Sequence, residues 1–210
     1  MNPPDRRRVA IHESAHAVAA TAMGFDVTRI SLSDDGRSGL CEYTADLADP
    51  LAPRKLLVVM LAGSVADELS GRKPEALQEP RARITELVTN PALRRLAERC
   101  SKDDPEQEDD ALTAARLLKK LPKGDRESTL QWAACEAEGL IRERCQLVEA
   151  VAKEILDGTL TLPSLPRRVH ARPWQPEATG FVRSSSVAFG QRPAKRIAEP
   201  FDRPMRLMSR

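Results

Sequence analysis

The pattern H-E-x-x-H at residues 12–16 constrains the fold of this chain more than any other feature. Two histidines four positions apart share one face of a helix, so His12 and His16 can both bind a single Zn²⁺ ion. Glu13 lies between them and can act as a general base on a water molecule at that metal. The chain has three histidines, and two of them fall in this pattern. We therefore expect a zinc-binding helix near the start of the chain.

The predicted zinc helix extends from about residue 5 to residue 23, with Gly24 as its stop signal. An alternative interpretation is a pair of core histidines that hydrogen-bond to backbone carbonyls. We favour the metal, because two imidazoles and a glutamate on one buried stripe are costly to desolvate without a cation. Helical spacing places both histidines on an apolar stripe, whose other members are Val9, Ala19, Ala20 and Met23.

A catalytic zinc site has three protein ligands and one open position, so a third ligand must come from elsewhere in the chain. The four cysteines form no C-x-x-C pair, and His170 falls in a region predicted to be disordered, which leaves a carboxylate. The acidic run 103–110 leads into a helical pattern in which Asp110 lies on the apolar stripe. Asp110 is therefore the candidate ligand. For Glu108 and Asp109 we prefer the alternative, a favourable interaction with the helix dipole.

Four segments resemble the peptidase domain of the FtsH-type AAA zinc metalloproteases. Residues 7–20 (RRVAIHESAHAVAA) resemble its zinc helix, in which the motif reads HEAGH. Residues 57–73 resemble its second helix, which has a small-residue LxGxxAEE pattern, and residues 108–114 resemble the segment that carries its third ligand, an aspartate. Residues 138–162 are similar to its last long helix. The resemblance implies Zn²⁺ as cofactor, with His12, His16 and Asp110 as ligands and Glu13 as the catalytic base.

The resemblance also implies a mainly α-helical, α+β peptidase domain over residues 1–162, with a small β-hairpin next to the zinc helix. In that family a strand near the zinc lines the substrate cleft. If the strand predicted here at residues 39–45 has a free edge, a peptide substrate could add to it as an extra strand. The alternative is an ordinary edge strand. The chain departs from the family at Ala15, which replaces a glycine, and in residues 74–103, which carry a helical pattern of their own.

Alternation and turn signals predict a hairpin with strands at residues 27–32 and 39–45. Small residues at positions 62, 63 and 66 allow the helix over residues 56–69 to approach another helix closely, which we expect to be the zinc helix. Helical patterns further along cover residues 80–99 with a break near Asn90-Pro91, 107–121, and 125–156 as one helix or two.

Residues 163–210 are rich in proline and arginine and are predicted to form a disordered tail. From Pro166 to Arg210 the chain has ten Lys/Arg and three Asp/Glu, a net charge of +7, which leaves −5 for the rest because the total is +2. The simplest interpretation is a solubilising tail. The alternatives are a docking peptide for a separate ATPase or adaptor, and a nucleic-acid-binding arm.

Composition favours a cytoplasmic protein without membrane contact. The longest apolar run, residues 56–62, is too short to span a bilayer. The zinc motif interrupts the only segment that could serve as a signal peptide. No G-x-x-x-x-G-K-[ST] phosphate loop is present, so the chain is expected to have no ATPase of its own and to cleave flexible or unfolded polypeptides. The alternative is a catalytically silent binding or regulatory module with the same fold. No pattern indicates an oligomeric state.

Overall fold

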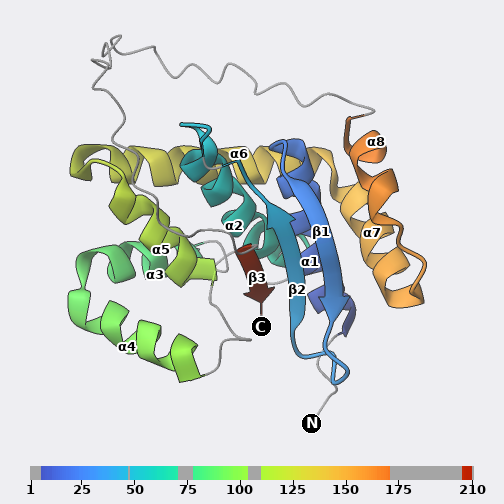
Figure 1. The fold of residues 1–210 in the computed structure, drawn as a ribbon, viewed down its shortest axis with the longest axis horizontal. Helices are drawn as coiled ribbons and strands as arrows, with labels where there is room; N and C mark the ends of the chain where they lie inside the picture. Colours follow the sequence, from blue (N-terminus) through green and yellow to red (C-terminus); the bar gives the residue numbers. More distant parts are fainter. Residues whose placement is uncertain (1–5, 47, 71–77, 104–109, 171–204, 210) are drawn as a thin grey trace.

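The computed structural model describes residues 6–46, 48–70, 78–103, 110–170 and 205–209, which form a mainly helical fold with one small sheet (Figure 1). The predicted class, mainly α with a β-hairpin beside the first helix, is confirmed. The elements are, in chain order, α1 (Arg6–Ala22), β1 (Asp26–Leu32), β2 (Gly39–Thr44), α2 (Ala52–Leu69), α3 (Gln78–Thr89), α4 (Pro91–Asp103), α5 (Asp110–Lys120), α6 (Arg126–Glu143), α7 (Cys145–Asp157), α8 (Leu165–His170) and β3 (Met205–Ser209).

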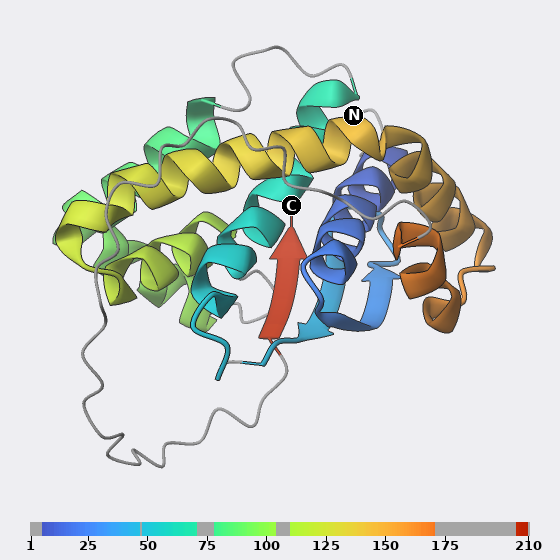
Figure 2. The ribbon, with the colours of Figure 1, turned by 90° about the horizontal axis from the view of Figure 1, so that it is seen from above.

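Helix α1 is the central element of the fold, and every residue from Val9 to Thr21 is buried. It contacts α2, α6, α7, α8 and both strands of the hairpin, and Figure 2 shows it between α2 and the pair α7 and α8. The sequence predicted burial of one stripe only. The other faces are also buried because they are lined by alanines, which let neighbouring helices approach closely. The hydroxyls of Ser14 and Thr21 donate to the carbonyls four residues earlier, which satisfies these polar groups inside the core.

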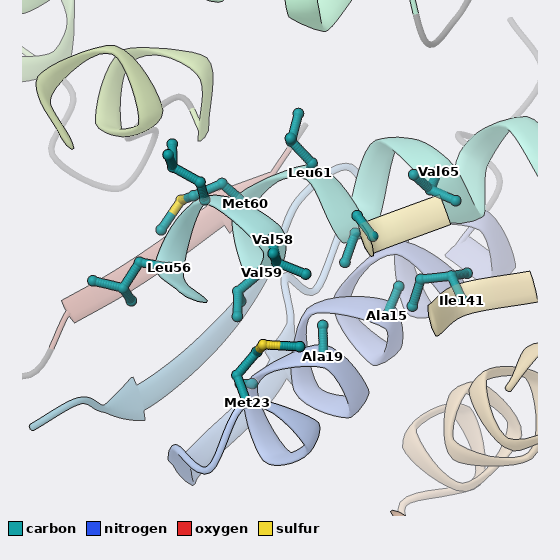
Figure 3. Close-up of a cluster of buried hydrophobic side chains, with 14 of the residues drawn as sticks. Ala15, Ala19, Met23, Leu56, Val58, Val59, Met60, Leu61, Val65 and Ile141 are labelled. Carbon is teal, nitrogen blue, oxygen red and sulfur yellow. The ribbon is translucent and has the colours of Figure 1, made fainter. Parts of the chain in front are cut away.

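Helix α2 packs directly on α1 through small and branched residues. Ala15 and Ala19 of α1 lie on the side that faces Val58 and Val59 of α2, and Ile141 of α6 closes the same cluster (Figure 3). The apolar run at residues 56–62 is almost fully buried, so it is a core segment. Each such buried side chain contributes roughly 1.5–3 kcal/mol. Neither α2 nor any other described helix has the length and apolar character needed to cross a bilayer.

The sheet has three strands in the order β1-β2-β3, all antiparallel to their neighbours. The pairing of β1 with β2 extends from Asp26↔Thr44 to Leu32↔Gly39. Strand β3 pairs with the other edge of β2, from Tyr43↔Met205 to Gly39↔Ser209. The edge of β2 to which a peptide could add if it were free is therefore occupied by the chain itself.

The predicted break near Asn90-Pro91 separates α3 from α4. The Asn90 side chain accepts hydrogen bonds from the backbone N–H groups of Ala92 and Leu93, both at 3.1 Å, and so caps α4. The pattern over residues 125–156 forms two helices, α6 and α7, which meet at Arg144. Gly158 closes α7 with φ +67°, a left-handed conformation that glycine adopts without strain.

Helix α8 extends the packed fold through residue 170, beyond the boundary predicted at residue 162. Leu165 and Val169 are fully buried, and α8 contacts α1. Arg144 donates to the backbone carbonyl of Val169, which ties α8 to the junction of α6 and α7. The sequence prediction missed this apolar pair because it lies among arginines and prolines. Of the predicted tail, residues 171–204 and 210 lie outside the described residues, and residues 205–209 form β3.

Candidate metal centre

The three predicted ligands come together between α1 and α5. The Oδ2 atom of Asp110 lies 3.1 Å from Nε2 of His16 and 3.6 Å from Nε2 of His12. One ligand atom from each residue lies within 4.8 Å of the other two. His16 is fully buried, and the Asp110 side chain is 15% exposed. The first residue of α5 is therefore placed beside the zinc motif, although it is far from the motif in the sequence.

Hydrogen bonds to residues on successive turns of α2 fix the orientation of the His12 and His16 rings. Nδ1 of His12 donates to the carboxylate of Asp67 at 3.1 Å, and Nδ1 of His16 donates to the backbone carbonyl of Val59 at 2.8 Å. Val59, Gly63 and Asp67 are four residues apart, so they form one row on α2 that faces the two histidines. Because both Nδ1 atoms act as donors, both Nε2 atoms are directed to Asp110.

Gly63 is the position where α2 makes room for both imidazoles. A Cβ atom there would lie 2.3 Å from Nε2 of His12 and 2.5 Å from Nε2 of His16, distances that no side chain can adopt. The expected close approach of the zinc helix to the small residues of α2 is thus confirmed. The sequence prediction did not assign a role to Asp67. Its signal was a carboxylate one turn after Gly63, directly after the apolar and small residues 56–66 of α2.

Electrostatics in the cluster favour a positive charge between the imidazoles and the carboxylates. Burial lowers the pKa of His12, but the carboxylates of Asp110 and Asp67 and the charge of Glu13 raise it, to about 10. Burial raises the pKa of Asp110, and the neighbouring imidazoles of His16 and His12 outweigh this effect, so that it is lowered from its ordinary value. If both imidazoles were neutral, the carboxylates of Asp110, Asp67 and Glu13 would place an uncompensated negative charge in a buried region.

The donor set fits a zinc ion. Nε2 of His12 is buried and too far from Asp110 for a hydrogen bond, and among the described residues it has no other partner. Nε2 of His16 and Oδ2 of Asp110 are both acceptors when the imidazole is neutral, so a proton or a metal must separate them. Tetrahedral zinc with ligands at about 2.0–2.2 Å separates them by about 3.3–3.5 Å. The observed 3.1 and 3.6 Å lie close to that spacing.

Glu13 lies beside the candidate ligands and against the first residue of β2. It is fully buried on α1, adjacent in sequence to His12. A Cβ atom on Gly39 would lie 2.4 Å from Cγ and 2.8 Å from Oε1 of Glu13, so the backbone of β2 passes directly over this side chain. The candidate general base therefore lies beside the middle strand of the sheet.

The cysteines whose side chains the structure describes, Cys41, Cys135 and Cys145, lie outside the cluster of His12, His16 and Asp110. Cys41 is buried in β2, and burial together with the charges of Glu13, Asp110 and Glu42 raises the pKa of its thiol well above the ordinary value. The alternative acids Glu108 and Asp109 lie outside the described residues. The third histidine, His170, ends α8.

Comparisons with known proteins do not assign this chain to a family. No protein-family model, curated protein or solved structure matches it.

Proposed function

We propose that this protein is a zinc-dependent peptidase related to the FtsH-type peptidase domains. His12, His16 and Asp110 bind the metal, and Glu13 is the general base. The observation that supports this most strongly is the approach of Asp110 Oδ2 to within 3.1 Å of His16 Nε2 and 3.6 Å of His12 Nε2. If the two histidines and Asp110 formed only a structural ion pair, neither the neighbouring Glu13 nor strand β2 beside it would be needed.

Zinc held by these side chains would acidify a water molecule and polarise a peptide carbonyl. The Glu13 carboxylate removes a proton from the attacking water as its oxygen adds to the carbonyl carbon. Glu13 then passes this proton to the amine nitrogen as the C–N bond breaks, which leaves a carboxylic acid and an amine. The hydrogen bonds from Nδ1 of His12 and His16 keep both Nε2 lone pairs directed at the metal position.

The proposed substrates are flexible or unfolded polypeptides. An extended peptide that took the place of β3 on β2 would have its backbone beside Gly39 and hence beside Glu13. Such pairing uses main-chain hydrogen bonds, which folded proteins do not offer except at sheet edges. Folded substrates would have to be unfolded by an ATPase before they could enter this site.

The second candidate function is a binding or regulatory module that keeps the metal site but does not cleave peptides. One observation favours it: the edge of β2 next to Glu13 is paired with β3. This module would bind zinc as tightly as the peptidase, so metal content alone does not separate the two functions.

The substitution Glu13→Gln separates them. We expect the zinc-loaded variant to keep the wild-type metal content and to lose cleavage of an unstructured protein such as casein by about 10²–10⁴-fold, because it lacks the general base. Glu138→Gln is the matched control, since Glu138 is a partly exposed glutamate of α6 paired with Arg142. Equal cleavage by wild type and Glu13→Gln would contradict the peptidase proposal.

A further inference from the structure

We propose that β3 occupies the peptide-binding edge of the candidate active site, so that residues 205–209 lie where a substrate would lie and restrict its access. The role of this edge rests on the proposed peptidase function. The pairing itself does not, and it can be tested in protein without metal.

The register of the sheet places β3 at the site. Ser209 pairs with Gly39, the residue whose backbone passes directly over Glu13. Neighbouring strands are about 4.8 Å apart, so the backbone at residue 209 lies one strand spacing from the residue beside the general base. Strand β3 also contacts α1 and α5, the two helices that carry the metal ligands. In Figure 1 it lies between β2 and α5.

The mode of pairing is the one that a substrate peptide would use. Strand β3 is antiparallel to β2 along Gly39–Tyr43, and main-chain hydrogen bonds of this kind tolerate many sequences. An added peptide and β3 need the same edge of β2, so they cannot bind together. Because β3 belongs to the same chain as β2, its pairing is intramolecular and is favoured over the pairing of a free peptide at a typical assay concentration.

Release of β3 from β2 should have one effect if β3 is a purely structural strand and another effect if it occupies the substrate position. Loss of a structural strand destabilises the fold and leaves the apparent affinity for substrate unchanged or weaker. Loss of an occupant opens the edge, so the apparent affinity rises while the chemical step stays the same. We therefore expect release of β3 to lower KM by about tenfold with little change in kcat, if β3 competes at its effective concentration.

The first experiment measures occupancy in the full-length, metal-free chain. Two consecutive prolines, Arg206→Pro with Leu207→Pro, must remove at least one N–H group that donates to β2, because donors alternate along an edge strand. The matched control, Arg206→Ala with Leu207→Ala, changes the same side chains and keeps both N–H groups. We expect alternate amides of residues 39–43 to exchange at least about tenfold faster with the prolines and at the wild-type rate with the alanines. Unchanged exchange in the proline variant would overturn the proposal.

The second experiment measures competition in the zinc-loaded protein. The proline variant should cleave an unstructured peptide with a lower KM than the alanine control, and a synthetic peptide with the sequence of residues 205–210 should inhibit it competitively. If exchange is faster in the proline variant but no variant cleaves the peptide, the pairing of β3 with β2 stands and the peptidase function is contradicted. Cleavage with the same KM in both variants, and no inhibition by the peptide, would overturn the occupancy proposal and leave the peptidase function intact.

Discussion

The carboxylate of Asp67 accepts a hydrogen bond from Nδ1 of His12 at 3.1 Å across the contact between α2 and α1. This bond leaves Nε2 of His12 as the nitrogen that faces Asp110 and the proposed metal position, and it places a carboxylate behind the ring. Both effects strengthen a histidine as a zinc ligand. In the proposed metal site Asp67 is thus a positioning residue, and α2 contributes to the site although none of its side chains belongs to the cluster of His12, His16 and Asp110.

Replacement of Asp67 by asparagine should weaken zinc binding by about 10–100-fold, because the amide can still accept the hydrogen bond but lacks the charge. The adjacent substitution Glu68→Gln removes a half-buried carboxylate from the same helix and is the control. A competitive titration with a chromophoric chelator measures both affinities. Equal zinc affinity for the two variants would show that Asp67 has no influence on the metal.

Replacement of Gly63 by alanine should destabilise the fold by about 1–3 kcal/mol and reduce zinc affinity, because the new Cβ would overlap both imidazoles. Gly139→Ala is the matched helical control, since a Cβ there meets no atom within 4 Å. It should stabilise α6 by about 0.5–1 kcal/mol. Urea unfolding of both variants compares the free energies, and a Gly63→Ala protein as stable as wild type would refute the close approach of α1 to α2.

Zinc binding should depend on pH through His12. Its pKa in the folded, metal-free protein is raised from 6.5 to about 10, so its proton stabilises this state fully below pH 6.5, and that stabilisation is lost as the pH rises to about 10. The zinc-bound state requires loss of the same proton. Zinc affinity should therefore rise about tenfold per pH unit between about pH 7 and 9. Calorimetry in buffers of different ionisation enthalpy should detect release of about one proton per zinc near neutral pH, and an affinity independent of pH would contradict this assignment.

Truncation should locate the end of the packed domain after α8. A chain that ends at residue 170 keeps Leu165 and Val169 in the core, whereas one that ends at the predicted boundary, residue 162, loses both. The shorter chain should be less stable by about 3–6 kcal/mol, from burial of roughly 1.5–3 kcal/mol per side chain. Both truncations lack β3, so its loss cancels in the comparison. Equal midpoints of urea unfolding would place the boundary at residue 162.

Local signals were sufficient to predict most elements and the three residues that form the cluster. The spacing of His12 and His16, the Asn90-Pro91 break and the stripe around Asp110 each act within one or two helical turns, and the structure places all three as expected. Such signals can be recognised in the sequence because the periodicity of helical side chains repeats within a few residues.

The missed features depend on contacts between distant segments. The burial of α1 on every face could not be inferred from its own alanines, because the neighbours that cover those faces come from α6, α7 and α8. The role of Asp67 required the position of His12. Strand β3 has no alternation of polar and apolar residues that would mark it, and its pairing with β2 is a tertiary interaction that overrides weak local propensity.

The most direct test of the metal centre is an equilibrium zinc titration of the metal-free, full-length chain and of its Asp110→Ala variant. The ligand geometry predicts one zinc ion per wild-type chain, and a variant that binds at least about 100-fold more weakly, because a charged ligand is lost. A wild-type chain that binds no zinc, or an Asp110→Ala variant that binds it with unchanged affinity, would contradict the assignment of His12, His16 and Asp110 as a metal site.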